Sequence, residues 1–349
     1  MRVQDQLEIK AEPGRVVDAG RRLVVDAAPR EVAPGIRGVR LALPFALDHV
    51  NLWLVDDRGG PTAIDAGLGD ARSQARWREL LAVEGAPSRL LVTHFHPDHM
   101  GLAGWLVAET GVPVWTTRTE WLMARMLALD TSAGFVAAGR ASDVAAGLPD
   151  ELIEQRARRG NAYRPKITEP PASYRRVREG EVLDIGGVAY DVLIGRGHAP
   201  EMICLFAAET GVLIAADQVL PRISPNVSVW GTEPLGDPLG EFLDSLGSFR
   251  RLPEDVLVLP SHGHPFHGLH ARIDQLAGHH EERLARALEG CASPTPAALI
   301  MRTLFDRPLD QHQIGFAIGE TLAHLNHLVH RGALEVEQDP RGRKLYRLR

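Results

Sequence analysis

Apolar and polar positions follow two patterns along the chain. Short apolar runs typical of buried strands recur at residues 39–44, 50–55, 62–65, 89–93, 112–115, 179–187, 190–194, 212–217 and 255–260. Stretches with helical spacing lie between some of them, at residues 70–85, 102–109 and 237–251. Because strand and helix patterns alternate in this way, we predict a layered α/β fold.

The pattern changes character over residues 118–170. An apolar helical stretch begins at Glu120, a second helical pattern covers residues 142–159, and a proline-rich loop follows. The large apolar side chains here either pack the segment onto the body or form an apolar wall for a substrate: Trp121, Met123, Met126 and Phe135. We therefore predict a helical insertion over about residues 118–170.

The two ends of the chain differ from the body at residues 35–270. Residues 1–34 are mixed polar and read as an N-terminal extension. Residues 271–349 read as a small C-terminal domain, with helices at 272–289, 297–305 and 319–330 and a terminal hairpin. In the last of these helices three histidines recur at every third position, and we interpret them as a polar face beside a leucine stripe: His324, His327 and His330.

Composition and charge narrow the function classes. The chain has 349 residues, 44% hydrophobic and 24% charged, as in ordinary globular proteins. The formal net charge of -6 gives no global basic field for nucleic acid. No secretory signal and no membrane-spanning run are visible, and Cys204 and Cys291 form no disulfide framework. We predict a cytoplasmic protein with no membrane partner.

The candidate chemistry begins where the apolar run at 89–93 ends. His94, His96, Asp98 and His99 follow within six positions. Residues two apart on an extended segment point the same way, so His94 and His96 can act together. Imidazoles and carboxylates are the usual ligands of zinc and similar divalent ions. A lone histidine would carry little weight, but four potential ligands in this spacing predict a metal site.

On this motif the chain resembles the metallo-β-lactamase-fold hydrolases, over about residues 35–270. The resemblance implies an αββα sandwich, here with a helical insertion and a winged-helix-like C-terminal domain. It also implies three further ligands at strand ends: His198 in Gly197-His198, Asp217 after the 212–216 run, and His262 in Pro260-Ser261-His262-Gly263. His264 and His267 compete for the last role. Asp65 matches a turn residue beneath the metal loop that orients ligands.

By the same resemblance the ligands divide between two metal ions. His94, His96 and His198 hold one ion, Asp98, His99 and His262 hold the other, and Asp217 bridges. We predict two divalent cations, zinc by default and iron or manganese as alternatives. Hydroxide bound to the pair would be the nucleophile, with Asp98, His99 and Asp217 as the catalytic side chains.

Two function classes compete for this centre. The first is hydrolysis of a thioester, lactone or ester of a small or acyl substrate, which the acidic charge and apolar insertion favour. The second is phosphodiester cleavage of single-stranded nucleic acid, which the resemblance of the tail to that of certain endoribonucleases suggests. A β-lactamase is third, because zinc lactamases commonly have cysteine at the position of Asp217. A homodimer formed through the tail is a further alternative. Beside His198, the residues Ala199-Pro200-Glu201 depart from the family pattern.

Overall fold

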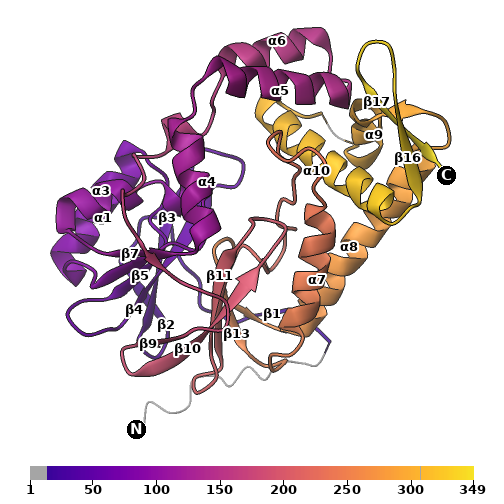
Figure 1. Cartoon of the computed structure of the whole chain (residues 1–349). Helices are drawn as coiled ribbons and strands as arrows, with labels where there is room; N and C mark the ends of the chain where they lie inside the picture. The colour runs from indigo at the N-terminus through magenta and orange to yellow at the C-terminus, as the bar shows by residue number, and fades with distance from the viewer. Residues whose placement is uncertain (1–13, 307) are drawn as a thin grey trace.

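Two seven-stranded sheets form the centre of the molecule. The computed structural model describes residues 14–306 and 308–349 (Figure 1). The first sheet has the order β2 (Arg30–Ala33), β3 (Ile36–Ala42), β4 (His49–Val55), β5 (Thr62–Ile64), β6 (Arg89–Leu91), β7 (Val114–Thr116) and β8 (Arg175–Arg176). The second has the order β1 (Val17–Asp18), β14 (Phe266–His267), β13 (Leu257–Pro260), β12 (Val212–Ala216), β11 (Met202–Ala207), β10 (Val188–Gly195) and β9 (Val182–Ile185).

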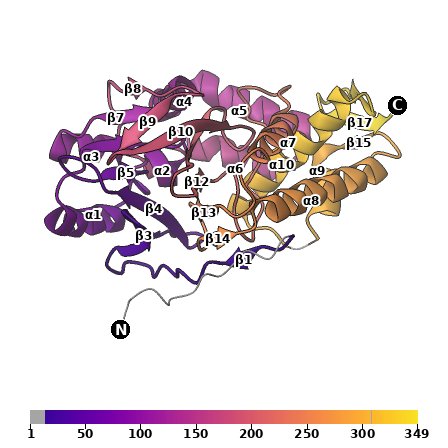
Figure 2. The same cartoon turned by 90° about the horizontal axis from the view of Figure 1, so that it is seen from below.

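Three apolar layers hold the sheets and helices together. Between the sheets, Trp53 and Leu91 of the first pack with Ile214 and Leu259 of the second. The outer face of the first sheet is covered by α1 (Ala71–Glu84), α3 (Ala103–Thr110) and α4 (Arg118–Leu129). The outer face of the second is covered by α7 (Pro238–Phe249) and α8 (Leu269–Gly290), on the opposite side of the molecule in Figure 2. The predicted αββα sandwich is confirmed.

The sheets begin earlier in the chain than the sequence indicated. Residues 1–13 of the predicted extension lie outside the described part. Of the remainder, β2 pairs antiparallel with β3, and β1 pairs with β14 at the far end of the body. These strands are short and half polar, so they lack the apolar run that marks a strand in sequence. The buried strand β11 was also missed, although Met202–Ala207 is entirely apolar.

The insertion contains three helices where two were predicted. After α4 come α5 (Ala133–Ala146), α6 (Asp150–Arg159) and a 3₁₀ turn, η1 (Arg164–Lys166). The predicted 142–159 helix is broken because Gly147 ends α5 in the left-handed conformation and Pro149 precedes α6. Trp121 stacks on Tyr174 with ring centroids 4.8 Å apart, while Met123 and Phe135 pack on the first sheet's helical layer. These three side chains attach the insertion to the body.

The C-terminal part consists of α8, α9 (Ala297–Leu304), α10 (Gln311–His330) and a small sheet. That sheet has the order β15 (Thr295–Pro296), β17 (Lys344–Leu348) and β16 (Leu334–Gln338). The terminal hairpin lies where it was predicted, whereas α10 starts at Gln311 and not at Gly319. Leu325 of α10 and Tyr346 of β17 share one buried cluster with Phe242 of α7, so this part packs directly onto the body.

Among the described residues, none forms a helix that is both long and apolar enough to cross a membrane.

Candidate metal centre

The first four candidate ligands lie in the loop after β6 and in the short helix α2 (Pro97–Met100). His94 and His99 are fully buried, while His96 and Asp98 are half-buried. Gly101 follows this helix. A Cβ atom added to Gly101 would lie 2.2 Å from the Pro97 carbonyl oxygen and 2.6 Å from the Gly67 carbonyl oxygen. Glycine at position 101 therefore lets the ligand loop lie directly on the loop that follows β5.

Asp65 fixes this loop from below. Its carboxylate accepts hydrogen bonds from the Thr93 backbone N–H at 2.7 Å and the Thr93 hydroxyl at 2.9 Å, and lies 2.8 Å from His99 Nδ1. Asp65 adopts a left-handed backbone with φ of 67°. A non-glycine residue in this region costs about 1 kcal/mol or more, and such strain collects at functional sites. Asp65 thus orients a candidate ligand, as the sequence predicted.

The other three candidate ligands come from the second sheet. His198 follows β10, Asp217 follows β12 and His262 follows β13. The glycine before His198, Gly197, has φ of 91°, and a Cβ there would lie 2.4 Å from the Cβ of Phe242. Ala216 adopts φ of 47° directly before Asp217. Tight or strained backbone thus sets the direction of two of these side chains.

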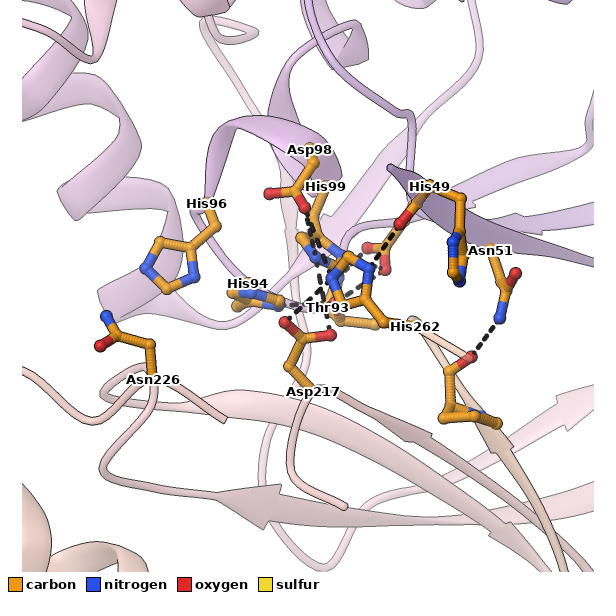
Figure 3. A network of polar contacts seen from close by, with 12 residues as sticks. His49, Asn51, Thr93, His94, His96, Asp98, His99, Asp217, Asn226 and His262 are labelled. Atoms are coloured by element: carbon orange, nitrogen blue, oxygen red, sulfur yellow. Dashed lines mark hydrogen bonds and ion pairs between the residues drawn. The ribbon is translucent and has the colours of Figure 1, made fainter. Parts of the chain in front are cut away.

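The seven predicted ligands converge at one place between the sheets' edges. Figure 3 labels these residues apart from His198. One triad consists of His94, His96 and His198, whose ligand atoms lie within 4.8 Å of one another. His198 Nε2 is 2.9 Å from His96 Nδ1 and 3.3 Å from His94 Nε2. The second triad consists of Asp98, His99 and His262. A further group of His94, His99 and Asp217 takes members from both triads, so the division between two ions stays a prediction.

Asp217 lies between the triads. Its Oδ2 atom is 3.3 Å from His198 Nε2 and 3.3 Å from His262 Nε2, and its Oδ1 atom is 3.8 Å from His99 Nε2. One carboxylate therefore faces members of both triads, as a bridging ligand must.

The nitrogen and oxygen atoms of these seven side chains are suited to binding cations. Among the described residues, His99 Nε2 and Asp217 Oδ1 are buried polar atoms with no hydrogen-bond partner. Buried polar atoms are rarely left unsatisfied, because each costs about 1–3 kcal/mol. Burial alone would lower the pKa of His99, but the surrounding carboxylates, that of Asp65 first, outweigh it and raise the pKa to about 10. The site thus attracts positive charge.

The neutral state of His94 and His96 also favours metal binding. Burial, followed by repulsion from neighbouring imidazoles, holds the pKa of His94 and the pKa of His96 well below the usual value. Neutral imidazole is the form that binds a metal. Burial raises the pKa of Asp217, but His262 and His99 outweigh it, so the pKa of this carboxyl stays well below its usual range and the group is ionised.

The ring nitrogens that face away from the centre have partners that orient the imidazoles. His94 Nδ1 lies 2.9 Å from the Thr93 hydroxyl, His198 Nδ1 lies 2.8 Å from the Asn226 carbonyl oxygen, and His262 Nδ1 lies 2.7 Å from the His49 carbonyl oxygen. Such contacts fix the tautomer and leave Nε2 free for a metal.

The choice among the three late histidines falls on His262. His264 Nδ1 lies 3.3 Å from Arg40, and His267 Nδ1 lies 3.0 Å from the Asp255 carbonyl oxygen, so both belong to other contacts. The loop that carries His262 is held by Asn51, which donates to the Pro260 carbonyl oxygen at 2.8 Å and to that of Gly263 at 2.9 Å.

Glu120 of α4 is a site residue that the sequence did not reveal. It is fully buried, and its two oxygens accept the backbone N–H groups of Phe95 at 2.9 Å and Glu201 at 2.6 Å. Phe95 lies between ligands His94 and His96, and Glu201 follows His198 by three residues. One carboxylate from the insertion therefore holds both loops of the first triad.

Trp230 is the second residue that the sequence did not single out. Its ring stacks on that of His96, with centroids 6.2 Å apart and an interplanar angle of 30°. It also meets Phe95 edge-on at 5.4 Å. The indole is 37% exposed, so it forms an aromatic wall beside the open edge of the centre, where Asp98 is also partly accessible.

Comparisons with known proteins agree with this geometry. Residues 46–262 match the model of the metallo-beta-lactamase superfamily, and residues 284–349 match that of a metallo-beta-lactamase-like C-terminal domain. A beta-lactamase domain protein from Burkholderia ambifaria is 39% identical, with a TM-score of 0.88 over 96% of this chain and 98% of its own. A metallo-beta-lactamase family protein from Thermus thermophilus is 29% identical, with a TM-score of 0.78 over 91% of this chain and 100% of its own.

A curated relative extends the comparison to an activity class. The probable metallo-hydrolase YqjP of Bacillus subtilis (strain 168) is 26% identical over 304 residues, which are 82% of this chain and 90% of that protein. With its αββα body, its convergent histidines and aspartates and its matching C-terminal region, this chain belongs to the metallo-beta-lactamase superfamily and is a metallo-hydrolase of that superfamily.

Proposed function

We propose that the protein is a dinuclear hydrolase of a thioester, lactone or ester with a small or acyl substrate. The observation that carries this proposal is the pair of ligand triads on either side of Asp217, open to solvent on the side of Asp98 and Trp230. Zinc is the metal we expect, because the donors are nitrogen and oxygen in a compact set.

In the proposed mechanism the chain's own residues hold the metal ions in place. One ion would be held by the first triad, His94, His96 and His198. The other ion would be held by the second triad, Asp98, His99 and His262, and Asp217 would bind both ions. When bound, such ions lower the pKa of a water molecule and polarise the carbonyl oxygen. Hydrolysis then adds hydroxyl to the carbonyl carbon and a proton to the leaving alcohol or thiol.

The surroundings of the centre favour an acyl substrate over a nucleic acid. The wall beside the open edge is aromatic, since Trp230 is partly exposed there and packs against the buried ring of Phe95. The C-terminal end is basic, as a contact with phosphate would require, but two of its arginines are paired with acidic side chains. Arg343 pairs with Asp339 at 2.7 Å, and Arg347 pairs with Glu335 at 2.9 Å. Phosphodiester cleavage of single-stranded nucleic acid stays the alternative and a β-lactamase the third candidate.

A hydrolysis screen with metal-loaded protein tests the proposal. Acyl-thioesters, lactones, aryl esters, a β-lactam and short single-stranded RNA are compared under the same conditions. We expect the protein to hydrolyse one or more of the acyl-thioesters, lactones and aryl esters. We also expect elemental analysis to find about two metal ions per chain. Cleavage of RNA alone would overturn the substrate class, and protein without metal after growth in metal-replete medium would overturn the dinuclear mechanism.

Two isosteric variants link the activity to the centre. Asp217→Asn keeps the shape of the bridging side chain but removes its charge, so metal content and turnover should both fall. Asp191→Asn makes the same change at an exposed position on β10 and should behave as the unchanged protein. Equal activity of Asp217→Asn and the control would show that Asp217 does not bridge.

A further inference from the structure

One face of α10 holds the segment of residues 226–237 against the metal centre. The contacts recur at i, i+7, i+8 and i+11 along the helix, which is a single helical face. The Gly319 carbonyl oxygen accepts from the Val229 N–H at 3.1 Å, Asn326 donates to the Gly236 carbonyl oxygen at 2.8 Å, His327 Nδ1 lies 3.0 Å from the Asp237 carboxylate, and His330 Nε2 lies 3.1 Å from the Leu235 carbonyl oxygen. Two of the three periodic histidines of this helix thus have a structural role in this contact.

The 226–237 segment meets the first ligand triad twice. The Asn226 carbonyl oxygen is the partner of His198 Nδ1, and the Trp230 ring stacks on His96. The segment is also covered from the insertion side, since a Cβ atom on Gly231 would lie 3.6 Å from the Cβ of Ser142 in α5. The C-terminal part of the chain therefore holds a segment whose Asn226 and Trp230 contact the first triad.

The fit between α10 and the segment leaves no spare room. A Cβ atom on Gly319 would lie 2.8 Å from the Ser228 Oγ and 2.9 Å from the Ser228 Cβ, closer than real Cβ contacts. Glycine at position 319 is what allows the helix to approach the segment to hydrogen-bond distance.

We infer that Trp230 contacts the substrate directly, and that α10 is a positioning element that holds Trp230 beside His96. The inference deepens the proposed function and rests on it. The exposed indole would lie along an apolar group next to the scissile carbonyl, so the preferred substrates carry an aryl or longer alkyl acyl group. Residues 311–330 thereby complete the acyl-binding side of the site.

The substrate contact is tested with Trp230→Ala and Trp230→Phe in the full-length, metal-loaded protein. The substrates are aryl esters that share one leaving group and differ only in the acyl group, from acetyl to phenylacetyl and octanoyl. Loss of one aromatic contact should raise KM for the larger acyl groups about tenfold more than KM for the acetyl ester. Trp230→Phe should retain most of the preference, and metal content should be the same in all three proteins.

The positioning role is tested through Gly319. Gly319→Ala should push the segment away and raise KM for the larger acyl groups in the same way as Trp230→Ala. Ser228→Gly in the same chain removes both clashing atoms and should restore KM to within about twofold. The matched control is Gly278→Ala on α8, where a Cβ atom would meet nothing within 4 Å.

A binding measurement separates this inference from the proposed function. Phenylacetate and acetate, the products of such esters, are titrated into metal-loaded protein, and binding is measured by isothermal titration calorimetry, whose signal does not depend on Trp230. We expect phenylacetate to bind about tenfold more tightly than acetate and this difference to vanish in Trp230→Ala. If no ester is hydrolysed but this difference is found, the proposed reaction fails and the aromatic contact stands. Equal binding of the two carboxylates, or an unchanged acyl preference in Trp230→Ala, would overturn the inference.

Discussion

Removing the Glu120 carboxylate should loosen both loops of the first ligand triad at once. In Glu120→Ala the backbone N–H groups of Phe95 and Glu201 lose their acceptor in a fully buried place. Each unsatisfied buried donor costs about 1–3 kcal/mol, so we expect a loss of about 2–6 kcal/mol in the free energy of unfolding. Glu120→Gln keeps one acceptor oxygen and should lose roughly half as much.

Urea unfolding with and without metal measures this loss, since the midpoint shifts at constant slope when only stability changes. A competing chromophoric chelator then measures zinc affinity, which should fall by roughly 10–100-fold in Glu120→Ala because the contact lies one step outside the ligands. Glu109→Ala on α3 is the control, since Glu109 is exposed and its loss should stay within about 0.5 kcal/mol. A Glu120→Ala protein as stable and as zinc-avid as the control would refute the reasoning.

Four further outcomes follow from the same contacts. Burial raises the pKa of Glu120 to about 7, so the folded state binds a proton that the unfolded state releases near pH 4.5. The free energy of unfolding, relative to Glu120→Gln, should therefore fall as pH rises from about 4.5 to 7, which urea midpoints at several pH values will test. Asp65→Asn should weaken metal binding by roughly 10–100-fold because it disturbs the orientation of His99, and an unchanged affinity in chelator competition would contradict this. Chelation of the bound metal should lower Tm, and restored zinc should raise it again, because ligands that bind only the folded state stabilise it. Gly101→Ala should destabilise by several kcal/mol in the same urea assay, because its Cβ would meet backbone atoms closer than 3 Å, and near wild-type stability would show that the loops can separate.

The ligands could be predicted because their signals are local. His94, His96, Asp98 and His99 stand in one short motif, and His198, Asp217 and His262 each come after an apolar run. A strand end is visible in sequence as a change from apolar to polar residues. The seven positions were therefore within reach of sequence reasoning, and the structure brings all of them together.

The supporting residues could not be predicted in this way. Glu120 acts on a residue 25 positions earlier and another 81 positions later, and nothing in its helical surroundings marks a buried carboxylate. Trp230 lies in a loop without periodicity, where its neighbours depend on how α10 packs. His324 was expected on a polar face, yet it is buried 3.2 Å from His280 of α8, because tertiary contacts decide which face of a helix is covered. Pairings between distant segments leave no local pattern.

The pairing of β1 with β14 also affects how the chain is made. Val17 pairs with His267, so the two strands are separated by 250 positions along the chain (from 17 to 267). During synthesis β1 leaves the ribosome first and has no partner until nearly the whole body has followed. Without β1, the edge of the second sheet at β14 is an open row of peptide groups, on which another chain could add a strand. Protein trimmed up to residue 20 should therefore be more prone to self-association than the full chain, in proportion to its concentration.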